Sequence, residues 1–175
     1  MFVRRVLFVV VFASWVLSPI AAAEASPCWR PPVVGEVVDS FRQPACTWCA
    51  GNRGIEYRVG VDSSVRAAAT GVVTFSGSVA GVGYLVIRSA GGYRHTYGRL
   101  ESILRERGHV VVAGSLVGVA SGSFHFGVRR DDTYVDPAPL LGELVGRWRL
   151  VPTDGRRARP SPDPEFRCQA RSVPR

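Results

Sequence analysis

One histidine of the chain, His125, has a sequence setting that would let it take part in chemistry. It stands in Ser123-Phe-His-Phe-Gly127, where small or polar residues alternate with phenylalanines. Because side chains of a β-strand point alternately to its two faces, we expect Ser123, His125 and Gly127 to share one open face. A histidine placed there can reach a metal ion or a substrate, although taken alone it is better explained as a surface residue without a role.

A second stretch, Tyr93 to Leu100, carries the other polar candidates. Strand alternation places His95, Tyr97 and Arg99 on one face. At ~3.3 Å per residue, His95 would lie about 13 Å from Arg99, which is too far for the histidine to replace the arginine in a site.

The elements that must position these residues are predicted to be strands. Runs of β-branched and aromatic residues, separated by turns that contain glycine, occupy residues 72–75, 84–87, 93–97, 110–112, 116–119 and 124–128. This spacing is typical of an all-β sandwich or barrel. Helix is expected only at Leu100 to Arg107 and as one turn within Leu140 to Val145.

Two stretches of the chain resemble each other. Residues 65–73 and residues 110–118 both read as a strand, a turn with glycine and a second strand. This duplication is typical of barrel-like hybrid domains, a pattern that lipoyl and biotinyl carriers share. Those carriers need a lysine, and the chain contains none, so that function is excluded.

Taken in order, these features resemble the lysostaphin/LytM-type zinc metallopeptidases, which cut peptide cross-links in bacterial cell walls. The resemblance covers residues 52–137, about half of the chain. It rests on the Gly-Ile-acid turn at Gly54 to Glu56, the two repeated stretches, the Tyr-Gly-x-Leu segment at 97–100 and the x-His-Phe-x-Val-Arg strand at 124–129. The resemblance implies a LytM-type β fold with short loops over residues 52–150.

In that family, zinc is held by His and Asp of H-x-x-x-D and by the second His of H-x-H. The resemblance places Asn52, Glu56 and His125 at these three ligand positions, and Arg99 and Ser123 at the two catalytic histidine positions. Only His125 matches the family, so the ligand positions are interpreted as vestigial, with no catalytic residue and no zinc expected.

Elementary chemistry supports this interpretation. Catalytic zinc takes three protein ligands, usually histidine or carboxylate, and an amide oxygen such as that of Asn52 is a poor one. Arg99 cannot release a proton near neutral pH, so it cannot act as a base. We hypothesise that Arg99 takes the cationic place of the metal and pairs with Glu56, with Asn52, Ser123 and His125 around them. The alternative is that the five residues drifted and face solvent separately.

The four cysteines, Cys28, Cys46, Cys49 and Cys168, predict two disulfides in an exported protein. Three pairings are possible. We favour Cys46–Cys49 with Cys28–Cys168, because the second bond would tie the two ends of the domain together. A redox pair and a four-cysteine zinc site are weaker alternatives.

The N-terminus reads as a secretory signal. Arg4 and Arg5 precede an apolar run of about 15 residues, and small residues follow at a cut site after Ala23 or Ala25. We expect a signal peptide over residues 1–23, a lead-in over 26–51 that contains Pro and Cys, the β domain over 52–150, and an Arg- and Pro-rich tail over 151–175 that is largely irregular. No membrane span is expected after cleavage.

The chain has a formal net charge of +8, all of it from arginine. Scattered arginines on an exported protein favour an anionic cell-wall surface over nucleic acid as the partner. Degenerate members of the resembled family keep the fold and lose the ligands, and some bind and activate cell-wall amidases. We therefore expect a bacterial, extracytoplasmic binding or regulatory module for peptidoglycan or a cell-wall hydrolase. The alternatives are a zinc endopeptidase with a non-standard ligand set and a structural envelope protein.

Overall fold

The computed structural model describes residues 27–46, 48–146 and 165–168. Within these residues nine strands form one antiparallel sheet, and two further strands form a separate small pair. Helical structure in the described part is limited to two single turns of 3₁₀ helix, η1 (Ala90–Gly92) and η2 (Ala138–Leu140). The all-β fold with little helix that the sequence predicts is confirmed.

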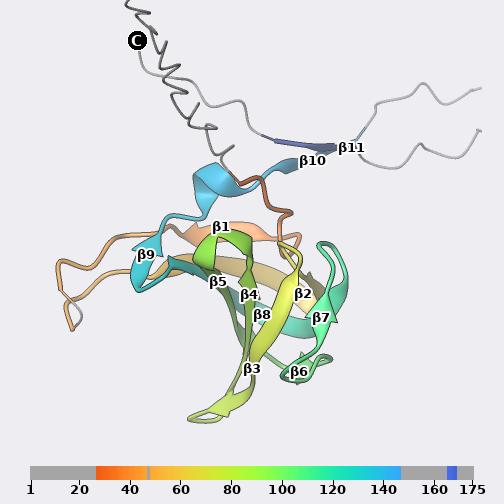
Figure 1. Ribbon diagram of the computed structural model, residues 1–175, viewed down its shortest axis with the longest axis horizontal. Coiled ribbons are helices and arrows are strands. Elements are labelled where there is room, and N and C mark those ends of the chain that lie inside the picture. The colour runs from red at the N-terminus through yellow and green to blue at the C-terminus, as the bar shows by residue number, and fades with distance from the viewer. Residues whose placement is uncertain (1–26, 47, 147–164, 169–175) are drawn as a thin grey trace, which may run out of the picture.

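The large sheet has the strand order β1-β2-β8-β5-β4-β3-β7, and β6 and β9 also pair with β8 (Figure 1). Its centre is therefore built from strands that lie far apart in the sequence. The strands are β1 (Glu36–Asp39), β2 (Gly54–Arg66), β3 (Gly71–Val79), β4 (Val82–Ser89), β5 (Tyr93–Leu100), β6 (Ser102–Ile103), β7 (Val110–Val111), β8 (Leu116–Arg130) and β9 (Thr133–Val135).

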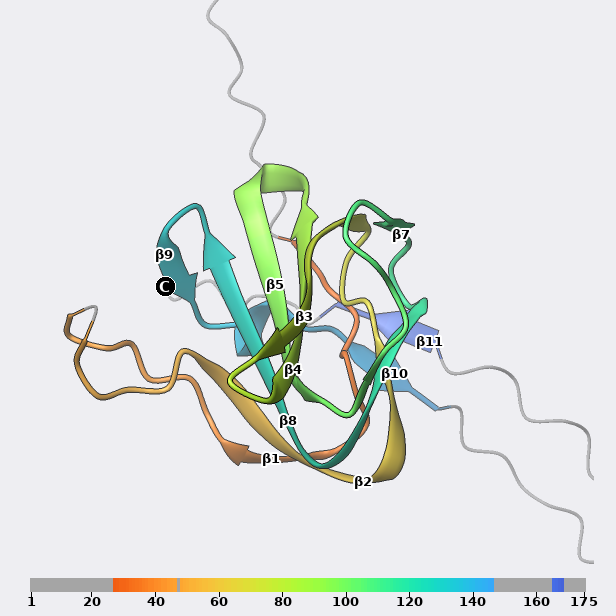
Figure 2. The ribbon, with the colours of Figure 1, turned by 90° about the horizontal axis from the view of Figure 1, so that it is seen from below.

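The two longest strands, β2 and β8, run side by side and bend together (Figure 2). Their pairing shifts register between Val59 and Ser63, and Asp62 and Gly122 take positive φ angles of 53° and 73° there. An irregularity of this kind bends a strand and increases its twist. The sequence predicts separate strands at 116–119 and 124–128 with a turn between them. That expectation is wrong, because Gly122 lies at the bend of one continuous strand.

The two similar stretches of sequence pack against each other. The backbone N–H of Ala67 donates to the carbonyl of Ser115 at 2.9 Å, and that of Gly114 donates to the carbonyl of Ala67 at 2.7 Å. Gly71 of β3 is paired with Val111 of β7. The repeat therefore brings two strand–turn–strand units together at one end of the sheet.

The core lies on the inner face of the sheet, and residues from both sides of the bend belong to it. Tyr97, Phe124 and Phe126 are fully buried. The segment before residue 52 also contributes, because Trp29 is buried in the same cluster and β1 pairs with β2. The described part of the lead-in therefore packs against the β domain.

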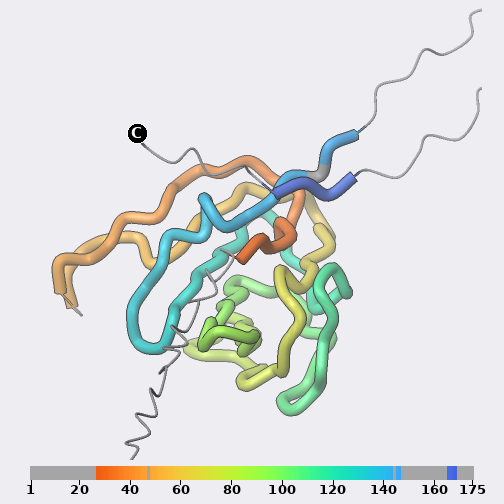
Figure 3. The backbone as a smooth tube through the Cα atoms, turned by 45° about the horizontal axis from the view of Figure 1, so that its top comes forward, coloured from red at the N-terminus to blue at the C-terminus, as the bar shows by residue number. Residues whose placement is uncertain are grey.

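Two local expectations need correction. Residues 100–107 are not helical: Ser102 and Ile103 form β6, which is paired with Val119 and Gly118 of β8. The helical turn expected within 140–145 lies earlier, as η2, and residues 143–145 form β10 (Glu143–Val145). This strand pairs with β11 (Glu165–Arg167) of the tail, which the analysis expected to be irregular (Figure 3).

Both favoured disulfides are present in the structure. Cys28 is bonded to Cys168 and Cys46 to Cys49. The first bond holds β11 and its partner β10 close to the start of the domain. The expected signal peptide and the rest of the tail, residues 151–164 and 169–175, lie outside the described residues. Among the described residues, no helix has the length and apolar character needed to cross a membrane.

Candidate functional site

The candidate site is built on a cross-strand pair at the centre of the sheet. Glu56 of β2 lies directly opposite His125 of β8. His125 Nδ1 and Glu56 Oε1 are 2.6 Å apart, and both side chains are mostly buried. As the alternation predicted, His125 lies on the outer face of its strand while Phe124 and Phe126 fill the core. The histidine is therefore held by a carboxylate from the neighbouring strand.

Arg99 completes this group from the other side. Its Nη1 donates a hydrogen bond to Glu56 Oε2 at 2.6 Å. Both carboxylate oxygens of Glu56 are thus occupied, one by His125 and one by Arg99. This arrangement matches the hypothesis that Arg99 pairs with Glu56.

A β-bulge places Arg99 on the opposite face from the one that strand alternation predicts. In the pairing of β4 with β5, Gly83 lies opposite Leu100 and Tyr84 opposite Gly98, so Arg99 is the extra residue. Its φ of 61° reverses the direction of its side chain. As a result Arg99 is exposed on the outer face, whereas Tyr97 and His95 point into the core. Plain alternation could not predict this change of face.

His95 has no place in the site, because it is a core residue. Its ring packs edge-on against Trp29, with the ring centroids 4.5 Å apart, and its Nε2 lies 2.8 Å from the hydroxyl oxygen of Ser89. Burial lowers the pKa of His95 to about 4, because the charged form loses its hydration. His95 is therefore neutral near pH 7 and shapes the core below the site.

Asn52 holds the backbone in place. Its amide nitrogen donates to the carbonyl of Ser40 at 3.1 Å, and its Oδ1 accepts from the backbone N–H of Gly54 at 3.2 Å. The side chain is buried between the end of β1 and the start of β2. The oxygen that would have to bind a metal is already used to shape the turn.

Ser123 is exposed on the outer face, opposite Arg58 of β2. The guanidinium of Arg58 is paired with Glu36 at 2.7 Å. An arginine cannot accept a proton, so this neighbour does not activate the Ser123 hydroxyl as a nucleophile.

The residues present do not fit zinc. A catalytic zinc site needs three protein ligands and one open position. At the family's positions stand an amide oxygen and a carboxylate that are both hydrogen-bonded, together with His125. In the part of the chain that the structure describes, no group of three or more His, Cys, Asp or Glu residues could hold a metal ion. The site therefore has the composition of an ion-pair cluster.

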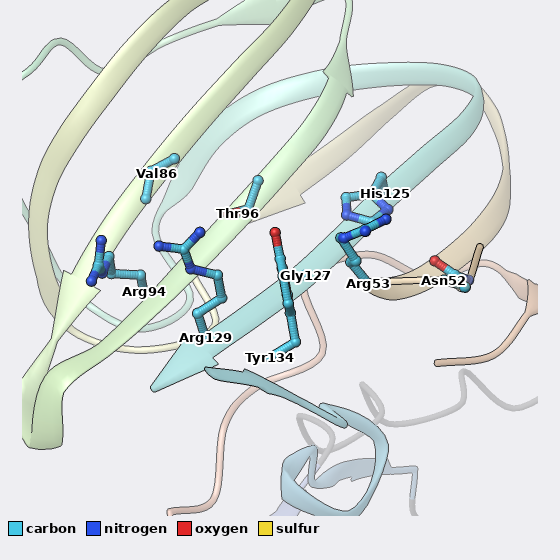
Figure 4. Close-up of a pocket in the computed structure, with 10 residues that line it drawn as sticks. Asn52, Arg53, Val86, Arg94, Thr96, His125, Gly127, Arg129 and Tyr134 are labelled. Atoms are coloured by element: carbon cyan, nitrogen blue, oxygen red, sulfur yellow. The ribbon is translucent and has the colours of Figure 1, made fainter. Parts of the chain in front are cut away.

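Next to this cluster lies a pocket of about 480 Å³ that the sequence analysis did not anticipate (Figure 4). Arg53, Arg94 and Arg129 line it, together with His125 and Tyr134. Strand alternation could have placed Arg129 on the face of His125. However, Arg94 and Arg53 lie near Arg129 only because of the register in which β5 and β2 pair with β8, and the sequence does not show that register.

The comparisons with known proteins agree with this fold. Residues 50–137 match the model of Peptidase family M23, and the chain belongs to that family. No curated protein matches the chain.

Several solved structures have the same fold. Csd3 from Helicobacter pylori superposes with a TM-score of 0.60 at 20% identity, over 66% of this chain and 35% of that one. SpoIIQ, solved as a pore-forming complex with SpoIIIAH, gives a TM-score of 0.59 at 19% identity, over 67% of this chain and 92% of the other. The catalytic domain of lysostaphin from Staphylococcus simulans gives 0.52 at 17% identity, over 60% and 90%. The chain thus spans about a third of the length of the Csd3 structure that it matches.

Proposed function

We propose that this chain is an exported, non-catalytic member of Peptidase family M23 that acts as a binding or regulatory module in the cell envelope. The observation that carries the proposal is that both carboxylate oxygens of Glu56 are already paired with other side chains. One of its carboxylate oxygens is 2.6 Å from Arg99 and the other is 2.6 Å from His125. A metal ion would have to displace the arginine and then remain next to its charge.

Loss of the catalytic groups supports the same conclusion. A general acid or base contributes roughly 10² to 10⁴-fold to a rate. The two positions that the family gives to such groups hold Arg99, a permanent cation, and Ser123, whose cross-strand neighbour is another cation. A hydrolase with this site would lack the metal, its bound water and both proton carriers.

The envelope location rests on the signal-like N-terminus and on the disulfides. Disulfide bonds persist in oxidising compartments, and this structure has two of them. The excess of arginine suits a polyanionic wall polymer. The partner is proposed to be peptidoglycan or a cell-wall hydrolase. The complex of SpoIIQ with SpoIIIAH shows one relative in which this fold is associated with a second protein.

The experiment incubates the chain without residues 1–23 with purified peptidoglycan, with and without added zinc. Sedimentation of the mixture measures binding, and the release of new amino groups measures hydrolysis. We expect binding without release, while the lysostaphin catalytic domain, as the positive control, releases amino groups. Zinc-dependent release by this chain would overturn the proposal in favour of a peptidase. For the proposal to stand with a hydrolase as the partner, a purified amidase must change its rate when the chain is added.

A further inference from the structure

The outer face of the sheet beside Glu56 carries a row of arginines. Arg88 of β4 is paired with Arg94 of β5, and Arg94 is paired with Arg129 of β8. Tyr134 of β9 extends the row, because it is paired with Arg129. Like charges opposite each other on neighbouring strands are destabilising. Such a row therefore lowers stability unless something of opposite charge lies against it.

Among the described residues, little negative charge lies against this row. Asp132 is 3.2 Å from Arg94 and 3.4 Å from Arg129, and its side chain is 91% exposed. Exposed ion pairs of this kind contribute about 0–1 kcal/mol, so an incoming anion can compete with Asp132. Glu56, the other carboxylate nearby, is already paired with Arg99 and His125. The charge of the pocket is therefore predominantly positive.

Tyr134 keeps two of the guanidinium groups in the pocket. The guanidinium carbons of Arg53 and Arg129 lie 5.6 and 5.4 Å from the centroid of its ring. In Figure 4, Arg129 lies on one side of Tyr134 and Arg53 on the other. Stacking on an aromatic ring restricts the planar guanidinium without using its hydrogen-bond donors. Arg53 also donates to the carbonyl oxygen of Cys49 at 3.4 Å, so it acts mainly as a wall of the pocket. Within the described part of the chain, Arg129 donates only to the exposed Asp132, at 3.4 Å, and a guanidinium held this way can turn to a planar, two-oxygen acceptor such as a carboxylate.

The surface between the ion-pair cluster and the arginine row is hollow, because a glycine of β8 contributes no side chain there. Gly127 lies between His125 and Arg129 on the same face of β8, opposite Thr96. A Cβ at Gly127 would come within 3.0 Å of His125 Nε2 and 3.1 Å of the carbonyl oxygen of Arg53. The trough between the ion-pair cluster and the arginine row depends on this missing side chain.

The trough continues onto an apolar surface. Val86 lines the cationic pocket and also a second cavity of about 480 Å³ on the β3–β4 hairpin. The other residues of this second cavity are Phe75, Val79, Ala80, Val82 and Tyr84. A ligand that fills both parts needs an anionic end and an apolar stretch next to it. A peptide with small apolar residues and a free carboxylate has this composition, whereas a sugar-phosphate polymer would leave the apolar part unused.

We propose that this trough binds a peptide through its free carboxylate, with the paired Arg94 and Arg129 at the carboxylate and the apolar residues of the peptide along Val86 and Tyr84. This inference rests on the proposed function, because it takes the old peptidase site to be a binding site. It adds the chemical class of the ligand and the residues that select it.

The test compares two peptides on the same protein. N-acetylated Val-Ala-Ala is titrated into the chain without residues 1–23, once with a free C-terminal carboxylate and once with a C-terminal amide. We expect the free acid to bind, the amide to bind at least about tenfold more weakly, and the free-acid affinity to fall as salt is raised. In NMR spectra, the amide signals of Thr96, Gly127 and Val86 should shift. Equal affinity for the two peptides, or no binding of either, would overturn the proposal.

Two double variants locate the binding. Arg94→Gln with Arg129→Gln removes two charges from the trough and should weaken the free-acid peptide at least about tenfold. The matched control, Arg66→Gln with Arg107→Gln, removes two exposed charges outside the trough and should leave the affinity within about twofold. Inorganic phosphate is a third arm, and binding of phosphate without the peptide would contradict the peptide assignment. Sedimentation with peptidoglycan that is retained while the peptides fail would remove this inference and leave the proposed function intact.

Discussion

The central strands of the sheet present two faces with opposite chemistry, and each face contains one histidine. On the inner face, His95 is fully buried between Trp29 and Phe126. On the outer face, His125 is hydrogen-bonded to Glu56 and lines a cationic pocket. The inner face stabilises the fold through burial, and the outer face holds the groups that face a ligand. The difference shows that one face of the sheet holds the fold together while the charged groups that a ligand could meet lie on the other.

The largest expected difference between the faces is in stability. Phe126 is fully buried, and Phe126→Ala should lower the free energy of unfolding by about 3–5 kcal/mol because it leaves a cavity. The adjacent substitution His125→Ala should cost only about 0.5–1.5 kcal/mol, the contribution of a hydrogen bond. Denaturant unfolding monitored by circular dichroism measures both variants. If both variants lose the same free energy of unfolding, the two faces contribute equally to stability and the comparison fails.

The buried histidine of the inner face should make stability depend on pH. The pKa of His95 is lowered from 6.5 to about 4, so the unfolded state binds a proton that the folded state does not between these values. Stability from this group is therefore complete above about pH 6.5 and is lost as the pH falls towards 4, by up to about 3 kcal/mol. His95→Leu should flatten this part of the pH profile relative to the wild type, as measured by urea unfolding at several pH values between 4 and 7. A profile that His95→Leu leaves unchanged would argue against a neutral core histidine.

Within the outer face, Glu56 should matter more than either of its partners. Glu56→Gln leaves Arg99 and His125 without their carboxylate and should cost about 1–2 kcal/mol. Arg99 is 47% exposed, so its coupling to Glu56 in a double-mutant cycle should be only about 0.5–1 kcal/mol. Urea unfolding of Glu56→Gln, Arg99→Gln and the double variant gives this value. Additive losses would mean that the pair contributes nothing to stability.

The smallest expected effect concerns the bulge at Arg99. The φ of 61° is unfavourable for any side chain with a Cβ, by about 1 kcal/mol. Arg99→Gly and Arg99→Gln both remove the ion pair, but only the glycine relieves the backbone. The glycine variant should therefore be more stable than the glutamine variant by about 0.5–1 kcal/mol. If the glutamine variant is the more stable one, the bulge does not strain the chain.

The sequence was sufficient to predict the two faces of the strand around His125, and insufficient for the rest of the outer face. Alternation around His125 placed Phe124 and Phe126 in the core, because the alternation of side chains and the apolar character of every second residue are both properties of this one strand. It failed for Arg99, because a bulge adds one residue and reverses the side chain. It also gave no sign of the arginine row, since that row depends on which residue of β5 lies opposite Arg129. Strand register depends on both strands of a pair, so the sequence of one strand cannot define it.

The central claim is that Glu56 is held by Arg99 and His125 and not by a metal. The most direct test exposes the chain without residues 1–23 to excess zinc, removes free metal by desalting and counts the retained zinc by mass spectrometry. The His125→Gln variant, treated in the same way, measures adventitious binding. The account predicts that the two proteins retain equal amounts, well below one zinc per chain. One zinc per chain that is lost in the His125→Gln variant would contradict it.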